Sequence, residues 1–300
     1  PVVASWNLKI NASNINSFKK CDVITDATNN YKAMDIPYVQ SADFITEINL
    51  LLPRHRLLVL METFKTLLLA VNILQSLKIV HFDLKIANVL FKRDTNLPRI
   101  VDFGISIYDC DNLFVRAKKK KVDDALRKLR DHFYIYTVEY RVWCLDIVVL
   151  SWIANKEQWD TTSAETILSD ILNDDNRLAF MPPSVLEDWQ TTTQAQLEKY
   201  SVMEMEDLIN YLLNQWRTWD TYSIGMIYFE IQDGLKDNRE SVFLRRWRSL
   251  LTLCTSPDPE MRIDVLDAKK QFEDLFLTWD DPMVYIKFLD DFVEHSTFQH

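Results

Sequence analysis

The segment IVHFDLKIANVLFKRDTNLPRIVDFG, residues 79–104, most constrains what this chain can fold into. Its short apolar runs IVHFDL, NVLF and RIVDFG are bounded by turn residues, a pattern that predicts strands. Between and after these runs stand four polar side chains at fixed spacings: Asp83, Lys85, Asn88 and Asp102. The question is whether these four residues form a reactive site or only bound a buried strand pair.

The length and composition indicate a folded soluble protein. A chain of 300 residues can bury a real core, in one large domain or two modest ones. Its hydrophobic share of 48% and charged share of 26% exclude a disordered or fibrous class. The net charge of -10 argues against nucleic acid as a partner, because phosphate binding needs a basic face. We interpret the one basic run, RAKKKK at 116–121, as a solvated loop.

The cysteines and the apolar runs indicate a cytoplasmic, reducing compartment. The four cysteines lack metal-ligand spacing, and no membrane partner is expected because no apolar run approaches the ~18 residues that span a bilayer. The start PVVASWNLKI lacks the charged n-region and long apolar core of a signal peptide. It also lacks an initiator Met, so we expect a fragment or a processed piece.

Coarse periodicity predicts an α+β protein with a helical bulk. Residues 1–35 contain short strand-like stretches, whereas helices are expected at 43–52 and 62–77. Further helices are expected in 112–135, through most of 147–215, at 221–231, in VFLRRWRSLLTLC and VLDAKKQFEDLF, and in the tail. Sparse strands followed by many helices are typical of the α+β class.

The four polar residues suit phosphoryl transfer, which needs positioning and charge stabilisation more than covalent chemistry. Asp83 is the candidate base, and Lys85 is the cation near the transferred phosphate. Asn88 and, fourteen residues later, Asp102 offer two oxygen ligands. Mg²⁺ prefers one or two protein carboxylates completed by phosphate oxygens and water, so this pair predicts a magnesium site.

HFDLKIANVLF followed by VDFG resembles the catalytic loop and the magnesium loop of eukaryotic-type protein kinases. The resemblance implies that Asp83 orients and deprotonates an acceptor hydroxyl, that Lys85 steadies the phosphate, and that Asn88 and Asp102 hold Mg²⁺ on ATP. A lysine two positions after the aspartate is the pattern of serine/threonine kinases, so a protein Ser/Thr hydroxyl is the implied acceptor. Small-molecule kinases share part of the loop but usually lack this lysine and D-F-G.

Other segments resemble the same family. YKAMDIPYVQ resembles the hinge, with Met34 and Asp35 where adenine meets the backbone. TVEY at 137–140 resembles the substrate loop, which implies that Thr137 orients Asp83 and Lys85. His81 is interpreted as a packed structural histidine.

Two more family positions concern the large lobe. WDTYSIGMIYFEI resembles its buried central helix, with Asp220 bonding back to the catalytic loop. CTSPDPEMRI carries Arg262, which is expected to pair with an acidic residue at the end of the activation segment. Asp146 is the first candidate partner, and Glu204 and Glu206 are rivals. Gly104 and Gly225, two of only three glycines, also fall on family positions.

The sequence departs from the family in three places. Phe82 replaces the arginine that in many kinases binds a phosphorylated activation loop, so regulation by activation-loop phosphorylation is not expected. Phe82 is expected to pack in the apolar core. Residues 147–215 form a helical insertion with a possible docking role, faintly similar to divergent kinases of large DNA viruses. No glycine precedes Gly104 and no glutamate precedes Glu47, so the Gly-rich loop and the Lys–Glu pair are missing.

The expected organisation is a small-lobe remnant at 1–35, a kinase large lobe at 36–280 and a helical tail at 281–300. We expect a serine/threonine protein kinase in an N-terminally incomplete chain. The alternative is a pseudokinase that acts as a binding scaffold without catalysis. The protein substrate and the oligomeric state stay open.

Overall fold

A computed structural model describes residues 4–9, 30–35, 41–51, 53–92, 97–111, 129–174, 178–234 and 242–277. The chain divides into two compact units, Pro1–Ser41 and Ala42–His300. The division therefore falls six residues beyond the boundary expected after residue 35. The basic run at 116–121 and the tail expected at 281–300 lie outside the described residues.

The first unit contains an antiparallel strand pair, in keeping with the short strands expected there. Strand β1 (Ala4–Lys9) pairs with β2 (Asn30–Asp35), in a register that sets Ala4 opposite Asp35 and Lys9 opposite Asn30. Met34 lies opposite Ser5 in the same register.

A second sheet contains strands from the segment 79–104, which carries the candidate site residues. Its order is β3-β4-β5, with β3 at Ser41–Asp43, β4 at Val89–Lys92 and β5 at Leu97–Ile100. Strands β4 and β5 are antiparallel, and Val89 pairs with Ile100. The strand expected over IVHFDL is wrong, because within it only Val80 forms a bridge, to Ile107. The amides of His81 and Phe82 instead donate to the side chain of Asp220 in α9 (Trp219–Gly234).

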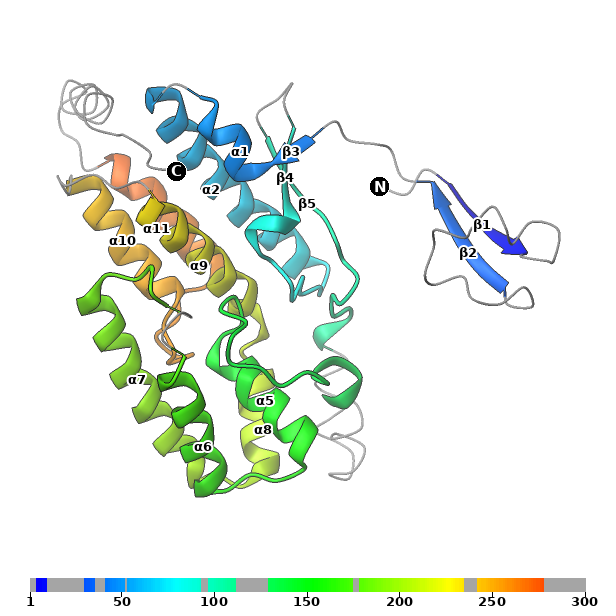
Figure 1. Cartoon of the computed structure of the whole chain (residues 1–300), viewed down its shortest axis with the longest axis vertical. Helices are drawn as coiled ribbons and strands as arrows, with labels where there is room; N and C mark the ends of the chain where they lie inside the picture. The colour runs from blue at the N-terminus through cyan, green and yellow to red at the C-terminus, as the bar shows by residue number, and fades with distance from the viewer. Residues whose placement is uncertain are drawn as a thin grey trace. The chain divides into compact units, whose positions relative to one another are not determined.

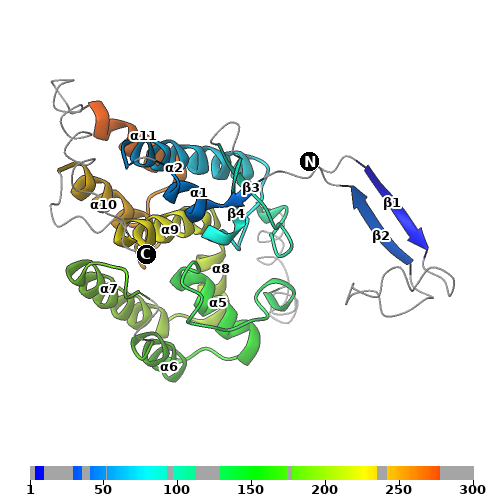
Figure 2. The same cartoon turned by 45° about the horizontal axis from the view of Figure 1, so that its top comes forward.

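Four helices build the core of the second unit around a cluster of aromatic rings. Helices α2 (Pro53–Ser76), α9 (Trp219–Gly234), α10 (Val242–Cys254) and α11 (Val265–Leu277) lie side by side in the upper part of Figures 1 and 2. Phe64 of α2 meets Tyr228 of α9 at a ring-centroid distance of 4.7 Å, and Trp247 of α10 at 5.4 Å. The short helix α1 (Phe44–Asn49) precedes α2, which starts at Pro53 rather than at residue 62.

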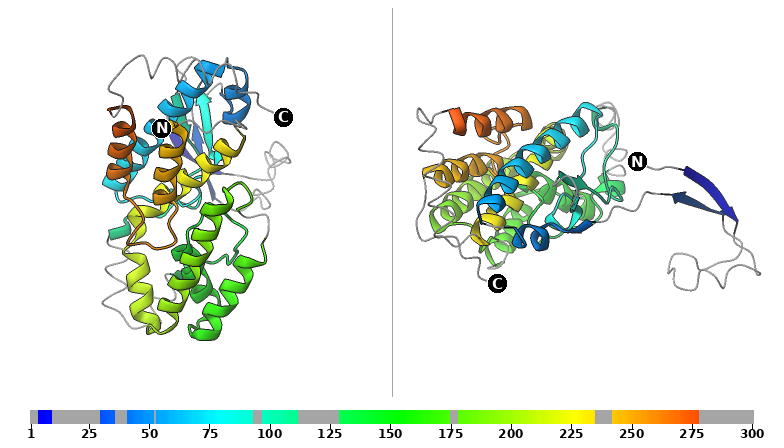
Figure 3. Two further views of the ribbon diagram at one scale, coloured as in Figure 1. Left: turned by 90° about the vertical axis from the view of Figure 1, so that its left-hand side faces the viewer. Right: turned by 90° about the horizontal axis from the view of Figure 1, so that it is seen from above.

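The described residues of the range 147–215 are mostly helical, as expected. It contains most of α5 (Leu145–Lys156), and then α6 (Thr161–Leu172), α7 (Pro183–Ser201) and α8 (Met205–Leu213). Helices α6 and α7 pack on each other, and α8 packs against α5 (Figure 3). Asp160 caps α6, because its carboxylate accepts a hydrogen bond from the amide of Ser163 at 2.7 Å. The α+β class is therefore confirmed, with helices predominating.

Helix α2 contradicts the expectation that no apolar run of this chain is long enough to span a bilayer. Its stretch His55–Ser76 is long and apolar enough to cross a membrane by length and composition, so the expectation that no run approaches this length is wrong. One face of α2 is nevertheless core, since Leu57, Leu60, Phe64, Leu67, Leu68 and Val71 are each at most 1% exposed. The core helix of a protein can have the same length and apolar composition as a membrane-spanning helix.

Candidate active site

Helix α9 fixes the backbone of the loop that carries Asp83. The buried carboxylate of Asp220 accepts the amide protons of His81 at 2.7 Å and Phe82 at 3.1 Å, as the family resemblance predicts. Burial raises the pKa of Asp220, while the two amides oppose that rise. Phe82 has a φ of 68°, in the left-handed region that side chains with a Cβ rarely adopt. The two hydrogen bonds hold this residue in a conformation that its own sequence does not favour.

The side chains of His81 and Phe82 pack inward, in agreement with their predicted structural roles. His81 is fully buried, and its Nε2 lies 3.0 Å from the carbonyl oxygen of Val101. The Phe82 ring lies 5.3 Å from the Phe133 ring and 5.2 Å from the Trp143 ring. Trp143 also donates from Nε1 to the Phe82 carbonyl at 2.8 Å. Phe82 thus anchors the loop to the segment that follows residue 133.

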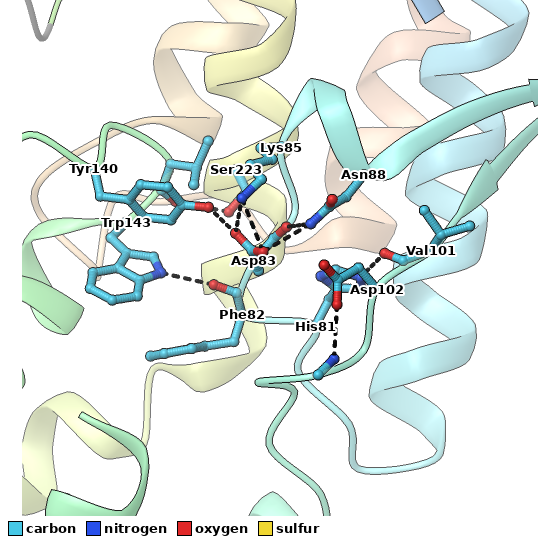
Figure 4. A network of polar contacts seen from close by, with 12 residues as sticks. His81, Phe82, Asp83, Lys85, Asn88, Val101, Asp102, Tyr140, Trp143 and Ser223 are labelled. Atoms are coloured by element: carbon cyan, nitrogen blue, oxygen red, sulfur yellow. Dashed lines mark hydrogen bonds and ion pairs between the residues drawn. The ribbon is translucent and has the colours of Figure 1, made fainter. Parts of the chain in front are cut away.

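Asp83 is held by its two loop partners (Figure 4). The Lys85 ammonium lies 3.1 Å from Oδ1 and 3.2 Å from Oδ2 of Asp83. The Asn88 amide nitrogen donates to Asp83 Oδ2 at 2.9 Å and to its carbonyl oxygen at 2.8 Å. Asp83 is 8% exposed, so its carboxylate is nearly buried yet reachable. The structure therefore brings together three of the predicted site residues.

Asp102 occupies the turn that follows β5. It has a φ of 64°, its side chain is exposed, and its Oδ1 accepts the Gly104 amide proton at 3.3 Å. A Cβ at position 104 would lie 3.1 Å from the same oxygen, a tight contact that a small shift of the exposed Asp102 side chain would relieve. The Val101 amide donates to the Asn88 carbonyl at 3.0 Å, so the two loops are tied together. Within the described residues, no hydrogen bond or ion pair joins Asp102 to Asp83, Lys85 or Asn88.

The donor chemistry of Asn88 and Asp102 fits a hard divalent cation. Asn88 uses only its nitrogen in the hydrogen bonds to Asp83, which leaves the amide oxygen as a ligand. The exposed Asp102 adds a carboxylate. In the part of the chain that the structure describes, no three His, Cys, Asp or Glu side chains cluster as a metal site. Two oxygen ligands leave the remaining positions of Mg²⁺ for phosphate and water.

Tyr140, rather than Thr137, supplies the hydroxyl that contacts Asp83. The Thr137 hydroxyl accepts the amide proton of Glu139 at 3.2 Å, and among the described contacts it does not reach Asp83 or Lys85. The Tyr140 hydroxyl donates to Asp83 Oδ1. The Lys85 ammonium lies 5.4 Å from the centre of the Tyr140 ring, which packs on the Trp143 ring at 5.0 Å. The orienting role of Thr137 stays a prediction, and Tyr140 is a contact of Asp83 that the sequence did not predict.

Nothing in the local sequence distinguishes Tyr140 from its neighbours. Its position depends on α9, where the Ser223 hydroxyl donates to the Val142 carbonyl at 2.8 Å. The same helix thus secures both the catalytic loop and the segment around Tyr140. Knowledge of where α9 packs would have been needed to find this contact.

A cavity of about 570 Å³ opens beside Lys85 and Tyr140. Its walls come from the catalytic loop, the segment 139–142, Asp174 and helix α9. Arg141 forms an ion pair with Glu230 at 2.6 Å on this wall. The cavity is large enough to admit a segment of another molecule beside Lys85 and Tyr140, which both contact Asp83.

Arg262 pairs with Asp146, the first of the three predicted candidates. The two side chains are fully buried, and Nη2 of Arg262 lies 2.5 Å from Oδ2 of Asp146. Trp219 donates from Nε1 to the same carboxylate oxygen at 3.0 Å. Burial opposes the positive charge, but the Asp146 carboxylate raises the pKa of Arg262 above its ordinary value. The rivals Glu204 and Glu206 are exposed.

The two predicted adenine contacts lie in the first unit. Met34 and Asp35 are the last residues of β2. Their contact with a nucleotide stays a prediction.

Comparisons with protein-family models, curated proteins and solved structures gave no match.

Proposed function

We propose that this chain has a protein-kinase-like fold and transfers the γ-phosphate of ATP to a serine or threonine hydroxyl of a protein. The observation that carries the proposal is the arrangement around Asp83. A nearly buried carboxylate is fixed by a lysine and an asparagine, on a backbone fixed by a buried aspartate. The cavity beside Lys85 and Tyr140 supplies room for the acceptor segment.

Asp83 acts as the base in this proposal. It holds the acceptor hydroxyl in line and accepts its proton as the new O–P bond forms. Lys85 lies within 3.2 Å of both carboxylate oxygens, so its charge offsets that of Asp83 and of the transferred phosphoryl group. Asn88 keeps the carboxylate plane fixed by its hydrogen bond to Oδ2.

Asn88 and Asp102 would hold Mg²⁺, which neutralises charge on the ATP phosphates when bound. The amide oxygen of Asn88 and the exposed carboxylate of Asp102 are the chain's contribution. Met34 and Asp35 are the proposed adenine contacts. Thr137, whose hydroxyl accepts the Glu139 amide proton and keeps its own proton to donate, is the proposed orienting residue of the substrate loop.

The test is transfer of labelled γ-phosphate from Mg-ATP to a generic Ser/Thr protein substrate, comparing the wild-type chain with Asp83→Asn. Loss of a general base lowers the rate by about 10²–10⁴-fold. A charge-matched control is Asp188→Asn, on the exposed face of α7. Thermal unfolding of each variant verifies that the fold is intact.

Two results would contradict the proposal. Equal transfer by wild type and Asp83→Asn would show that Asp83 is not the base. No transfer by any variant would show that the chain does not have the proposed activity. Asp188→Asn is expected to transfer phosphate at the wild-type rate.

A binding role without transfer is the second candidate. No glycine precedes Gly104 and no glutamate precedes Glu47, so the sequence supplies neither a Gly-rich phosphate loop nor the glutamate of the usual Lys–Glu pair. Calorimetric titration with Mg-ATP separates the candidates. Binding that Asp102→Asn weakens, in a chain that transfers nothing, would favour the scaffold.

A further inference from the structure

The outer side of helix α2 carries an exposed apolar stripe. Leu69, Ile73 and Leu77 follow one another at four-residue spacing, which places them on one side of the helix. They are 38%, 59% and 61% exposed. In the same turns Leu68 and Val71 are fully buried, so this half of α2 is apolar both inside and outside. A helix that is apolar all round is normally buried on all sides, so the stripe calls for a partner.

The stripe continues the interface between α2 and α11, which pack on each other (Figure 2). Lys65 stands four positions before Leu69, and its ammonium forms an ion pair with Glu273 of α11 at 3.1 Å. Helix α11 ends at Leu277, and the exposure of the stripe increases with distance from Lys65. Helix α11 therefore covers the line of residues at its beginning, and the remainder extends beyond this contact.

The segment VYIKFLDDFVE, residues 284–294, follows α11 and lies outside the described residues. At 100° per residue, its four polar side chains fall within an arc of about 100°, and its seven apolar side chains occupy the other side. The polar positions are 287, 290, 291 and 294. This separation is the pattern of a helix that lays one face on an apolar surface.

The connection from α11 is long enough to bring this segment to the stripe. Glu273 and Leu277 are four residues apart in α11, and Lys65 and Leu69 are four apart in α2, which is about 6 Å along each helix. Residues 278–283 separate α11 from the amphipathic segment, and these six residues span up to about 20 Å when extended. The segment can therefore reach Leu69 whichever way α11 points.

We propose that residues 284–294 form a helix whose apolar face covers Leu69, Ile73 and Leu77. Helix α2 would then be enclosed between the core and this helix. The covered turns lead into the site segment, because the Ile79 amide donates to the Leu74 carbonyl at 2.9 Å and Val80 bridges to Ile107. The helix would thus support the end of α2 from which the loop that carries Asp83 departs.

Photo-crosslinking in the full chain tests the proposal. A benzophenone amino acid at position 73 is expected to link to residues 284–294 of the same chain, in a yield that does not depend on chain concentration. The matched control carries the same amino acid at position 202. Val202 is an apolar residue that is 83% exposed just after α7, outside the stripe, and no link from there to 284–294 is expected.

Two asparagine variants test the two faces of the segment. Phe288→Asn changes its apolar side, and Asp290→Asn changes its polar side. Phe288→Asn should abolish the link and speed hydrogen exchange of the amides in 284–294 by about tenfold or more, because local opening then dominates. Asp290→Asn should leave both the link and the exchange unchanged.

The remaining outcomes overturn the inference. Links that join only two different chains would assign the stripe to a second copy. Links to the lipid of added neutral vesicles, in place of protein, would assign it to a membrane. No link to 284–294, with amide exchange there as fast as in an unfolded peptide, would exclude the helix. None of these measurements depends on phosphate transfer, so the proposed function is tested separately.

Discussion

In the loop that carries Asp83, the amide of His81 is bonded by Asp220, 139 positions further along the chain. Helix α6, by contrast, begins at Asp160, whose carboxylate bonds the Ser163 amide only three positions away. The loop contains a left-handed residue, Phe82, whereas α6 has ordinary helical geometry. The local sequence of the loop does not favour the conformation of its backbone. The local sequence of α6 does favour a helix.

This difference separates two kinds of stability in one unit. Near Asp83, geometry is imposed by buried polar contacts from α9, so changes there should alter transfer and stability together. In α6 and α7, local signals and apolar packing suffice, so changes there should alter stability alone. Predictions of decreasing size follow from this contrast.

The largest effect is expected from Asp220→Ala. It leaves two buried amides without an acceptor, at about 1–3 kcal/mol of unfolding free energy for each. Transfer should fall with it, because the loop loses its support. Denaturant unfolding and phosphate transfer measure the two losses, and Asp220→Asn, which keeps one acceptor oxygen, should lose less of both. Unchanged transfer in the alanine variant would refute the imposed geometry.

Arg262→Met should destabilise the unit by about 3–5 kcal/mol, because it leaves the buried Asp146 carboxylate with the Trp219 hydrogen bond but without an opposite charge. Replacing both residues by apolar ones, as in Arg262→Met with Asp146→Leu, should restore much of the loss. The free energy of unfolding from denaturant titration checks both variants. A double variant as unstable as the single one would mean that the charged pair itself, rather than the unpaired charge, matters.

Ile167→Val tests the α6–α7 pair. Ile167 is fully buried, and removal of one methylene group there should lower the unfolding free energy by about 0.5–1.5 kcal/mol. The rate of phosphate transfer should not change. A transfer rate that falls well beyond the unfolded fraction would show that the two regions are coupled after all.

The smallest effect is expected from Asp160→Ala. The Ser163 amide, together with Gln158, holds the pKa of Asp160 below its ordinary value. The cap therefore contributes stability above the ordinary aspartate pKa and loses it as the pH falls through the lowered value. The difference in Tm between wild type and variant should be small at pH 7 and vanish at strongly acidic pH. A difference that persists in acid would assign it to helix propensity instead.

The sequence predicted residues that act through their own type and spacing. The loop trio Asp83, Lys85 and Asn88 could be recognised in this way, because their contacts span at most five positions. The helices of 147–215 could be predicted because apolar periodicity and helix caps depend on residues that are close together in the sequence. The contact of Asp220 was reached only through the family resemblance.

The features that could not be predicted from the sequence depend on packing between segments that are far apart in the chain. The hydroxyl that contacts Asp83 is that of Tyr140, and α9 fixes this segment through the hydrogen bond from Ser223 to Val142. The sequence TVEY does not indicate that contact. The strand expected at IVHFDL failed for a related reason, since its backbone bonds go to Asp220 rather than to a neighbouring strand. Helix α2 starts nine residues before the predicted position 62; its first turn is polar at Arg54, His55 and Arg56, and the apolar run 57–60 follows.

The bond between Asp220 and the catalytic loop also sets an order of assembly during synthesis. A ribosome that has released the first 200 residues has delivered Asp83, Lys85, Asn88 and Tyr140, but neither Asp220 nor Ser223. Local helices such as α6 can form at that stage, whereas a contact of such long sequence separation cannot. Nascent chains arrested before α9 should therefore expose residues 79–104 to protease, and protection should appear only once α9 has emerged.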